Sequence, residues 1–344
     1  MAQFVGFDVS MKETTICVVD DAGATVWEGR RASDPGALAA ALARHAPEAV
    51  RVALETGPAS TWLWHELKAR GVPVVCIDAR HANAALQMRP NKSDRSDARG
   101  LAEIVRMGWY REVRVKSLEA QRTRVLINTR ARLVRVRHEL MNQIKAVLMA
   151  YGLPLPSARG RRFDDAVIAA VVDRDWLGPV LLPLVEVWRS TLEQTDRLDK
   201  ALLAMARARA DCRRLMTVPG VGAITALTFA AAVDDPGRFA RSSSLGAYLG
   251  LAPRRYQSGE VDRSGRISRC GDAQLRAYLY EAALVLLFRV RRWCALKAWG
   301  LRLAKRSGTR NAAVGVARRL AVTMHAMLAS GAEFRWSAAP ASAA

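Results

Sequence analysis

The stretch Phe4-Val5-Gly6-Phe7-Asp8-Val9-Ser10 predicts a β-strand, and it places one carboxylate among apolar neighbours. Burying a carboxylate without a partner is costly, so Asp8 needs a functional or structural reason to be there. A second apolar run, from Val50 to Glu55, is followed at once by Thr56-Gly57-Pro58. We therefore expect Glu55 at the carboxyl tip of a strand, the edge at which open sheets bind ligands.

Two further acids, Asp94 and Asp97, lie three residues apart at the predicted start of a helix, which puts both side chains on one face. Mg²⁺ prefers carboxylate oxygen, and two such ions about 3.5 to 4 Å apart suit phosphoryl transfer on a nucleic-acid backbone. A structural alternative makes Asp94 an N-cap and Asp97 an acid favoured by the helix dipole, but it leaves Asp8 unexplained. We therefore predict a site for two Mg²⁺ ions with four acids as ligands and catalytic residues: Asp8, Glu55, Asp94 and Asp97.

The composition indicates a polyanionic partner. The 344 residues carry a formal net charge of +21 and have a pI near 10.8. Arginine, the better bidentate phosphate ligand, dominates the basic residues, although a GC-rich genome would give the same bias. Five cysteines without CxxC spacing predict reduced thiols and no zinc site. No signal-peptide pattern or membrane-spanning run is present, so we expect a cytoplasmic bacterial protein with no membrane role.

The order of predicted elements indicates an α/β fold for the first region, residues 1–110. Short turns between the first three strands favour an antiparallel meander, and helices between the later strands make those strands parallel. A mixed sheet of this order is typical of the RNase H-like fold, and it would place Asp8 and Glu55 on neighbouring strands. The predicted elements are strands at 4–10, 14–20 and 24–30, a helix at about 35–45, a strand ending at 55, a helix at 59–70 and a strand at 72–78.

The four acids lie in three short stretches: Gly6-Phe7-Asp8-Val9-Ser10, Leu54-Glu55-Thr56-Gly57 and Lys92-Ser93-Asp94-Arg95-Ser96-Asp97-Ala98. Together these stretches resemble the RuvC-like DEDD domain of the insertion-sequence transposases in the family numbered one hundred and ten. The resemblance implies that the acids bind Mg²⁺ and act on DNA.

The second predicted region, residues 111–210, is a basic helical middle. Between Arg111 and Lys145 ten Arg or Lys accompany only three Glu. Apolar residues recur there every seven positions, as in a coiled coil. They are Leu126, Leu133, Leu140 and Val147.

A second candidate helix runs from Trp188 to Met205, after a connector with prolines and glycines at 152–184. The two helices form either an antiparallel hairpin within one chain or the arm of a dimer whose arginines face phosphate, and both can hold together. The arginines expected to bind nucleic acid are Arg122, Arg124, Arg130, Arg132, Arg135 and Arg137.

The third predicted region, residues 211–335, is all-α in character. The stretch Leu215-Met216-Thr217-Val218-Pro219-Gly220-Val221-Gly222, followed by an Ala-rich helix, looks like a helix-hairpin-helix. In such a motif Gly220 and Gly222 would expose backbone N–H groups to a DNA phosphate at a helix N-terminus. A plain turn between two helices is the alternative.

The stretch from Leu251 to Arg276 also resembles the same family, here the core of its C-terminal transposase domain. Ser258 matches the position of the family's nucleophilic serine, which implies attack on a DNA phosphodiester. A serine needs activation by a base or a metal, and Tyr256 and Ser264 are alternative nucleophiles. From the residues alone, Ser258 and its following glycine are ordinary turn chemistry. Guanidinium groups could hold the scissile phosphate here: Arg254, Arg255, Arg263, Arg266, Arg269 and Arg276.

Residues 282–332 contain no Asp or Glu, whereas ten Arg or Lys fall between Arg289 and Arg319. Uncompensated charges repel one another, which favours nucleic-acid contact over a solvated basic face.

The resemblance implies a DNA transposase or recombinase that cuts and rejoins donor and target DNA through a covalent phosphoserine intermediate. It also implies a homo-oligomer, a dimer or a tetramer, and a structured non-coding guide RNA, the bridge RNA. Positive charge suits RNA and DNA alike. Two alternatives stay open: a RuvC-like hydrolytic endonuclease on branched DNA, with a metal-bound water as nucleophile, and a non-catalytic RNA- or DNA-binding protein.

Overall fold

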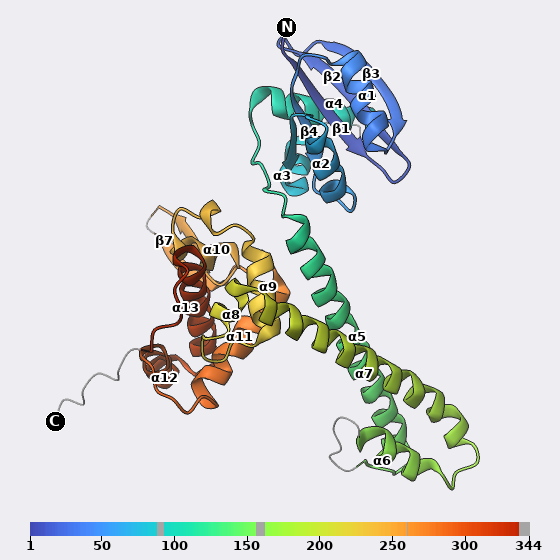
Figure 1. Cartoon of the computed structure of the whole chain (residues 1–344), viewed down its shortest axis with the longest axis vertical. Coiled ribbons are helices and arrows are strands. Elements are labelled where there is room, and N and C mark those ends of the chain that lie inside the picture. The colour runs from blue at the N-terminus through green and yellow to red at the C-terminus, as the bar shows by residue number, and fades with distance from the viewer. Residues whose placement is uncertain (88–92, 156–161, 260, 337–344) are drawn as a thin grey trace, which may run out of the picture. The chain divides into compact units, whose positions relative to one another are not determined.

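The computed structural model describes residues 1–87, 93–155, 162–259 and 261–336 (Figure 1). It divides into two compact units, Met1–Lys116 and Ser117–Ala344. The first unit ends at Lys116 rather than at residue 110, because the segment after its last helix returns to the sheet. The Val113 amide donates to the Cys76 carbonyl at 2.7 Å, and His65 Nε2 lies 2.9 Å from the Lys116 carbonyl.

The first unit is built on a five-stranded mixed sheet in the order β3-β2-β1-β4-β5. Pairing is antiparallel between β1 and β2 and between β2 and β3, and parallel between β1 and β4 and between β4 and β5. The structure therefore confirms the predicted mixed sheet, which is consistent with the RNase H-like fold. The strands are β1 (Gln3–Val9), β2 (Glu13–Asp20), β3 (Thr25–Ala32), β4 (Ala49–Glu55) and β5 (Val74–Ile77).

Helices cover both faces of this sheet. One face presents Val5 and Phe7 of β1 to Leu38 of α1 (Pro35–His45) and Leu63 of α2 (Ser60–Ala69), all in one buried cluster. Successive side chains of a strand point to opposite faces, so Gly6 and Asp8 belong to the other face. That face is covered by α4 (Asp94–Met107), with α3 (Ala79–Leu86) packed beside it.

The second unit begins with a long helical hairpin within one chain, one of the two arrangements that the sequence left open. Helix α5 (Leu118–Ala150) packs along α7 (Leu177–Ala208), and α6 (Arg162–Val171) packs on α7 at the far end (Figure 1). Ile144, Phe163 and Trp188 form the apolar centre there. Part of the predicted connector, residues 156–161, lies outside the described residues.

The heptad residues expected to form the seam of this hairpin are only half-buried. Leu126 packs against the C-terminal core and Leu140 against the far cluster, whereas Leu133 belongs to neither. The fully buried residues of α5 instead include Ile127 and Ile144. The seven-residue stripe is therefore offset from the buried face of the intrachain hairpin.

The C-terminal part of the second unit is a helical core with one protruding β-hairpin. Buried residues of α5 and α7, such as Ile127 and Leu202, share this core, which joins the predicted middle and C-terminal regions into one unit. Across the described residues no helix is long and apolar enough to cross a bilayer. The elements are α8 (Ala210–Leu215), α9 (Ala223–Val233), α10 (Leu245–Tyr248), β6 (Pro253–Ser258), β7 (Val261–Ile267), α11 (Ala273–Phe288), α12 (Ala295–Ser307) and α13 (Thr309–Ser330), with 3₁₀ turns at Pro236–Arg238 and Ser242–Ser244.

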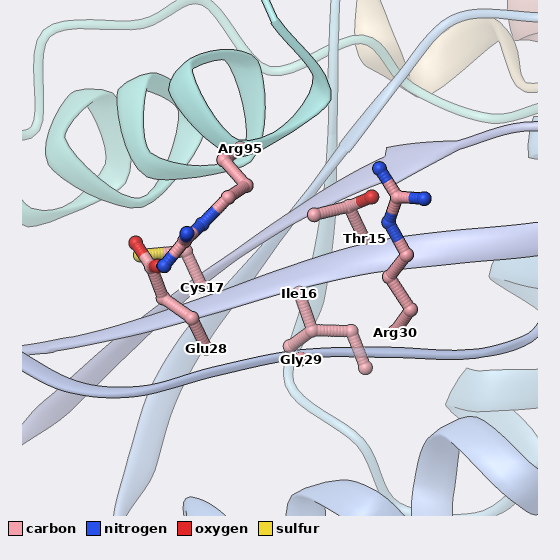
Figure 2. A pocket seen from close by; sticks show the side chains of 7 residues that line it. All are labelled: Thr15, Ile16, Cys17, Glu28, Gly29, Arg30 and Arg95. Carbon is pink, nitrogen blue, oxygen red and sulfur yellow. The ribbon is translucent and has the colours of Figure 1, made fainter.

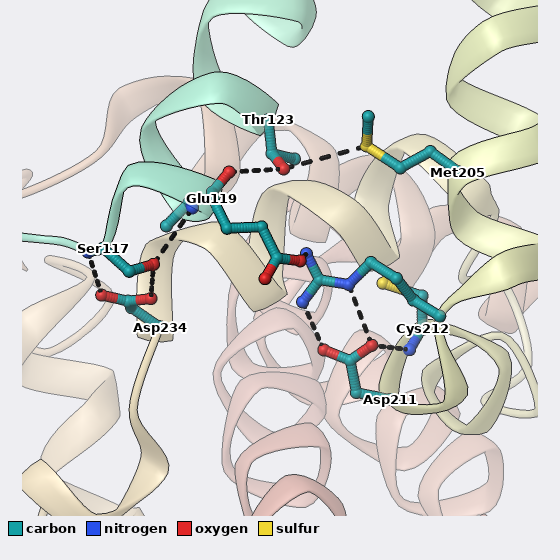
Figure 3. A network of polar contacts seen from close by, with 9 residues as sticks. Ser117, Glu119, Thr123, Met205, Asp211, Cys212 and Asp234 are labelled. Atoms are coloured by element: carbon teal, nitrogen blue, oxygen red, sulfur yellow. Dashed lines mark hydrogen bonds and ion pairs between the residues drawn. The ribbon is translucent and has the colours of Figure 1, made fainter.

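A polar network fixes the start of α5 to this core (Figure 3). Ser117 caps the helix, because its Oγ accepts from the Ala120 amide at 3.1 Å and donates to Asp234 Oδ1 at 2.6 Å. Asp234 ends α9, with a φ of 63°. At the other end of the network, Arg209 pairs with both Glu119 and Asp211. The first turn of α5 is therefore held by two loops of the core.

Candidate active site and nucleic-acid interface

Asp8 lies in a row of residues that crosses three strands near the carboxyl end of β1. In the antiparallel registers Asp8 pairs with Thr15 of β2, and Thr15 pairs with Arg30 of β3. Cross-strand neighbours share a face, so the three side chains lie on the side of the sheet that α4 covers. Asp8 is half-buried there. Arg30 therefore lies in the same row as the predicted metal ligand Asp8, two strands away from it.

Glu55 continues the same row on the other side of β1. The parallel register pairs Phe7 with Leu54, so Glu55 follows at the level of Asp8. Both acids are half-buried and fall on the α4 face by the alternation of side chains along a strand. The sequence prediction that Asp8 and Glu55 lie on neighbouring strands is confirmed.

Gly6 lets α4 approach this face at backbone distance. A Cβ at Gly6 would lie 2.0 Å from the Ala98 carbonyl oxygen and 2.5 Å from the Ala102 nitrogen. No other residue fits without moving the helix. The close crossing fixes the first turn of α4, where Asp94 and Asp97 stand, relative to β1.

Asp94 does not cap its helix, which corrects the structural alternative. The N-cap is Ser93, whose Oγ accepts from the Ser96 amide at 3.2 Å, while Ser96 Oγ accepts from the Ser93 amide at 2.9 Å. Asp94 is instead engaged by Arg30, whose Nη2 donates to its Oδ2 at 3.2 Å. Lys92, in the stretch that carried the resemblance, lies outside the described residues.

A small pocket of about 210 Å³ lies beside this row (Figure 2). Arg95, from α4, reaches over β3 and donates from Nε to Glu28 Oε2 at 2.9 Å, with Cys17 next to Glu28. Burial, reinforced by the Glu28 charge, raises the pKa of the Cys17 thiol to about 12. Cys17 therefore stays protonated at neutral pH and is no nucleophile. Two arginines that line the pocket thus neutralise carboxylates: Arg95 pairs with Glu28, and Arg30 pairs with Asp94 outside the lining.

The four acids supply the oxygen donors that Mg²⁺ prefers, and the strand order gathers Asp8 and Glu55 at one sheet edge with the first turn of α4. Within the part of the chain that the structure describes, however, no group of three or more His, Cys, Asp or Glu side chains is placed to hold a metal ion. The donors therefore fit a divalent ion in type and in location, but the described side chains do not close around one.

Ser258 lies at the tip of the exposed hairpin formed by β6 and β7. It is the last residue of β6 and pairs with Val261, and Gly259 follows it with a φ of 55°, in the left-handed region that favours glycine. The turn expected at Ser258 and Gly259 is therefore present, and it joins two strands of a ribbon that was not predicted from the sequence. Among the described residues no side chain hydrogen-bonds the Ser258 hydroxyl. A base or metal for its activation must therefore come from elsewhere.

Several arginines predicted to bind nucleic acid have partners within the fold. Arg124 pairs with Asp272 at 3.0 Å, and Arg130 pairs with Asp199 at 2.6 Å. The remaining contacts are Arg255 with Asp262 at 2.7 Å, Arg254 with the Ser268 carbonyl at 3.3 Å, and Arg276 with the Leu249 carbonyl at 3.1 Å. To bind phosphate, these side chains would have to share or leave their present partners.

The other predicted arginines are available to a polyanion. They make no ion pair within the described residues, and most are exposed. On α5 they are Arg122, Arg132, Arg135 and the half-buried Arg137, and on the hairpin and after it they are Arg263, Arg266 and Arg269. Both groups carry several positive charges along one element, which is the pattern that attracts a phosphate backbone.

The turn between α8 and α9 is a close helix contact as well as a candidate phosphate site. Gly220 has a φ of 89°, and a Cβ there would lie 2.4 Å from the Ala282 carbonyl oxygen of α11. Packing against α11 therefore requires glycine at position 220. Gly222 is exposed, precedes α9 and has open space around it. Only Gly222 keeps the geometry expected of an open helix N-terminus, and phosphate binding there stays a prediction.

Comparison with known proteins covers both units. Residues 5–152 match a DEDD transposase domain of the IS110 type, and residues 212–298 match the model of the transposase IS116/IS110/IS902 family. The chain is 32% identical over 290 residues to a probable family 20 transposase of Pseudomonas aeruginosa, covering 80% of this chain and 83% of that protein. The chain belongs to the IS116/IS110/IS902 family of transposases. The resemblance noted in the sequence is therefore confirmed, and the protein is an insertion-sequence transposase.

Two other relatives place the family match in context. A transposase for the insertion sequence element IS1111A of Coxiella burnetii is 29% identical over 344 residues, covering 98% of this chain and 92% of that protein. A pilin gene-inverting protein of Moraxella bovis is 28% identical over 122 residues, covering 35% of this chain and 37% of that protein. The IS1111A transposase thus matches this transposase over both of its units.

The base of the hairpin formed by β6 and β7, here called the serine hairpin, depends in this transposase on two glycines that the sequence patterns did not single out. Gly250 has a φ of 67°, and a Cβ there would lie 2.3 Å from the Cys270 carbonyl oxygen. Gly271 has a φ of 72° and is equally close to the Tyr248 carbonyl oxygen. Because Gly250 has no side chain, the segment that carries Gly271 can pack against it, and the segment that carries Gly250 packs against Gly271 in the same way. Two glycines flanking a polar stretch with alternating arginines were the available signal for a hairpin.

Proposed function

We propose that this transposase cuts and rejoins DNA by using Ser258 as nucleophile together with a divalent-metal site formed by Asp8, Glu55, Asp94 and Asp97. The observation that carries the proposal is the row across the sheet, which brings Asp8 level with Glu55 and sets Arg30 against Asp94. Asp8 and Glu55 lie level with each other on neighbouring strands, on the face that α4 covers, and Asp94 and Asp97 stand in the first turn of that helix.

The metal would be Mg²⁺, held by the acids of β1, β4 and α4. Such an ion supplies Lewis-acid polarisation of a phosphate oxygen. The chain itself contributes placement: the sheet fixes Asp8 and Glu55, and the backbone contact at Gly6 fixes the first turn of α4. Arg30, which donates to Asp94 Oδ2, would compete with the ion for that carboxylate.

In the serine step, the Ser258 oxygen forms a bond to phosphorus as the bond from phosphorus to one sugar oxygen breaks. The serine proton passes to a base, and the released sugar oxygen takes up a proton. A covalent serine–DNA ester then stores the energy of the phosphodiester, so a second strand can be joined without a further energy source. The exposed position of Ser258 at a hairpin tip suits this role, since DNA can reach its hydroxyl.

The test compares two serines of the same hairpin on DNA that carries the insertion-sequence ends. Ser264 pairs with Arg255 on the opposite strand and is exposed like Ser258. We expect Ser258→Ala to abolish both the denaturant-resistant protein–DNA adduct and strand transfer, while Ser264→Ala retains both. Asp8→Asn and chelation of Mg²⁺ should abolish cleavage. An adduct that survives Ser258→Ala and is lost in Ser264→Ala would move the nucleophile to Ser264.

One observation favours a second candidate function. No side chain among the described residues activates Ser258, whereas the acids are gathered in a different unit, Met1–Lys116. A hydrolytic nuclease would need only the acids and a water molecule. In that case Ser258→Ala would cleave branched DNA at the wild-type rate, and no adduct would form with the wild-type protein.

We also propose two partners for this transposase: a second copy of the same chain and a structured guide RNA. Self-association would run along the half-buried heptad stripe of α5, and a structured guide RNA would contact the unpaired arginines of that helix. Recombination rather than simple cutting is supported by the Moraxella bovis relative, whose name describes gene inversion. RNA that co-purifies with the protein and maps beside its own gene would support guidance, and its absence would argue against it.

A further inference from the structure

A large groove in the C-terminal core lies apart from the serine hairpin tip. It has a volume of about 1140 Å³, and it runs between α12, α13 and the segment that follows α13. Its floor is apolar, with Leu303, Val322 and Met327 among the lining residues. Its polar lining is dominated by four arginines: Arg306, Arg318, Arg319 and Arg335.

An aromatic ring lies in the groove beneath a guanidinium. The Arg319 guanidinium stands 3.8 Å from the centre of the Trp299 ring, the spacing of a stacked cation–π pair. Trp299 is half-buried, and Gly315 of α13 gives it room, because a Cβ at Gly315 would lie 3.3 Å from the ring. Arg319 is exposed and Trp299 is partly exposed in the groove lining, so a planar base can reach this pair.

The charge around the groove is strongly one-sided. The four lining arginines are exposed and make no ion pair among the described residues, and Glu333 is the single acid in the lining. Arginines in this state repel one another until an anion arrives. An apolar peptide would leave them unpaired, and a DNA duplex would present phosphates but no base faces to the apolar floor.

We propose that this groove binds unpaired nucleotides, with a base stacked on Trp299 and Arg319 and the backbone phosphates on Arg306, Arg318 and Arg335. Aromatic side chains beside a basic track are the usual means of holding single strands without reading their sequence. The volume accommodates about two or three unstacked nucleotides, judged against ligand pockets of roughly 300 to 1,000 Å³. The strand is either DNA or RNA, because both share a base and a phosphate. The inference goes beyond the proposed chemistry and does not depend on Ser258 or the four acids.

The test measures binding without cleavage, on the full-length protein in the presence of a chelator. Fluorescence anisotropy compares a labelled 12-nucleotide dT strand, the matching rU strand and a 12-base-pair duplex at a fixed salt concentration. The test variant is Arg319→Ala with Arg335→Ala. Its control is Arg302→Ala with Arg310→Ala, which removes the same charge from exposed positions of α12 and α13 outside the groove.

We expect the groove variant to lose at least about tenfold in affinity for a single strand, and the control to lose no more than about twofold. The duplex should be affected equally by both variants. Tighter binding of dT or of rU identifies the source of the strand, and either result supports the groove. Equal losses for the two variants on single strands would overturn the proposal, because they would show diffuse charge attraction only.

Substitutions at Trp299 separate the contribution of base stacking from the contribution of charge. Trp299→Phe should bind the strand within about threefold of the wild type, whereas Trp299→Leu should lose at least about tenfold, since leucine offers no π face. Circular dichroism melting of both variants shows whether the core is intact. Should Trp299→Leu fail to fold, quenching of 2-aminopurine placed in the strand provides the second readout. Unquenched 2-aminopurine on the bound wild-type protein would contradict base stacking.

Discussion

Arg30 Nη2 donates to Asp94 Oδ2 at 3.2 Å, and this contact joins the edge strand β3 to the first turn of α4. Both side chains are more than half exposed, so the pair itself contributes little stability. The pair instead affects whether the Asp94 carboxylate is available to bind a metal ion. A carboxylate that is held by a guanidinium is a weaker ligand for a metal ion, because the two cations compete for the same oxygen atoms.

Replacing Arg30 should therefore strengthen metal binding at the proposed site. Arg30→Gln removes the competing charge, and we expect the Mg²⁺ concentration for half-maximal DNA cleavage to fall about three- to tenfold. Isothermal titration with Mg²⁺ should show the same shift without DNA. The matched control is Arg95→Gln, which breaks a pair between α4 and Glu28 that involves none of the four acids. Equal responses of the two variants would show that Asp94 has no special part.

A methyl group at Gly6 should displace the helix that carries two of the acids. Gly6→Ala puts a Cβ 2.0 Å from the Ala98 carbonyl oxygen, so we expect a loss of about 3 kcal/mol or more in the free energy of unfolding. Urea denaturation followed by circular dichroism measures it. Gly57→Ala is the control, because a Cβ at Gly57 has nothing within 4 Å. Unchanged stability of Gly6→Ala would mean that α4 does not contact β1 at this point.

The half-buried stripe on α5 should mediate self-association. Leu133 belongs to no buried cluster of the described fold, so Leu133→Glu should shift the protein toward the monomer while leaving its melting temperature within about 3 °C. Sedimentation velocity measures the shift toward the monomer, and calorimetry measures the melting temperature. Leu148→Ala provides the contrast: Leu148 is fully buried, so we expect about 2 to 5 kcal/mol of lost stability with self-association retained. A wild-type sedimentation profile for Leu133→Glu would rule out this interface.

Sequence alone predicted the first unit well because local signals and packing agree there. The apolar runs of β1 and β2 and the short turns between strands indicate the order of the sheet, and the capping pair of Ser93 and Ser96 sits where the helix was expected to start. The predicted strand order put Asp8 and Glu55 on neighbouring strands, and the parallel register of the structure places them level with each other.

The second unit was harder because its determinants are distant in sequence. Nothing near Arg130 indicates Asp199, and nothing near Arg124 indicates Asp272, so arginines that the fold uses looked like free phosphate ligands. The serine hairpin depends on Gly250, whose contact with Cys270 joins segments about 20 residues apart. The heptad stripe predicted a seam, but the buried face of α5 is set by α7, α9 and α6 rather than by the repeat.

Acid should weaken the junction of α7 and α8 through Asp211. Burial raises the pKa of this carboxyl, but hydrogen bonds from Arg209 and the charge of Arg209 lower it more, and the net pKa is below its ordinary value. A depressed folded-state pKa contributes stability that is fully present above the unfolded pKa of about 3.9 and is lost as pH falls through the folded value. We expect Asp211→Asn to cost about 1 to 2 kcal/mol at pH 7 and progressively less below about pH 4. Urea unfolding midpoints between pH 3 and pH 7 show whether the stabilities of Asp211→Asn and wild type converge as the pH falls. Asp173→Asn is an exposed control. A constant difference between Asp211→Asn and wild type over that range would show that ionisation of Asp211 does not stabilise the fold.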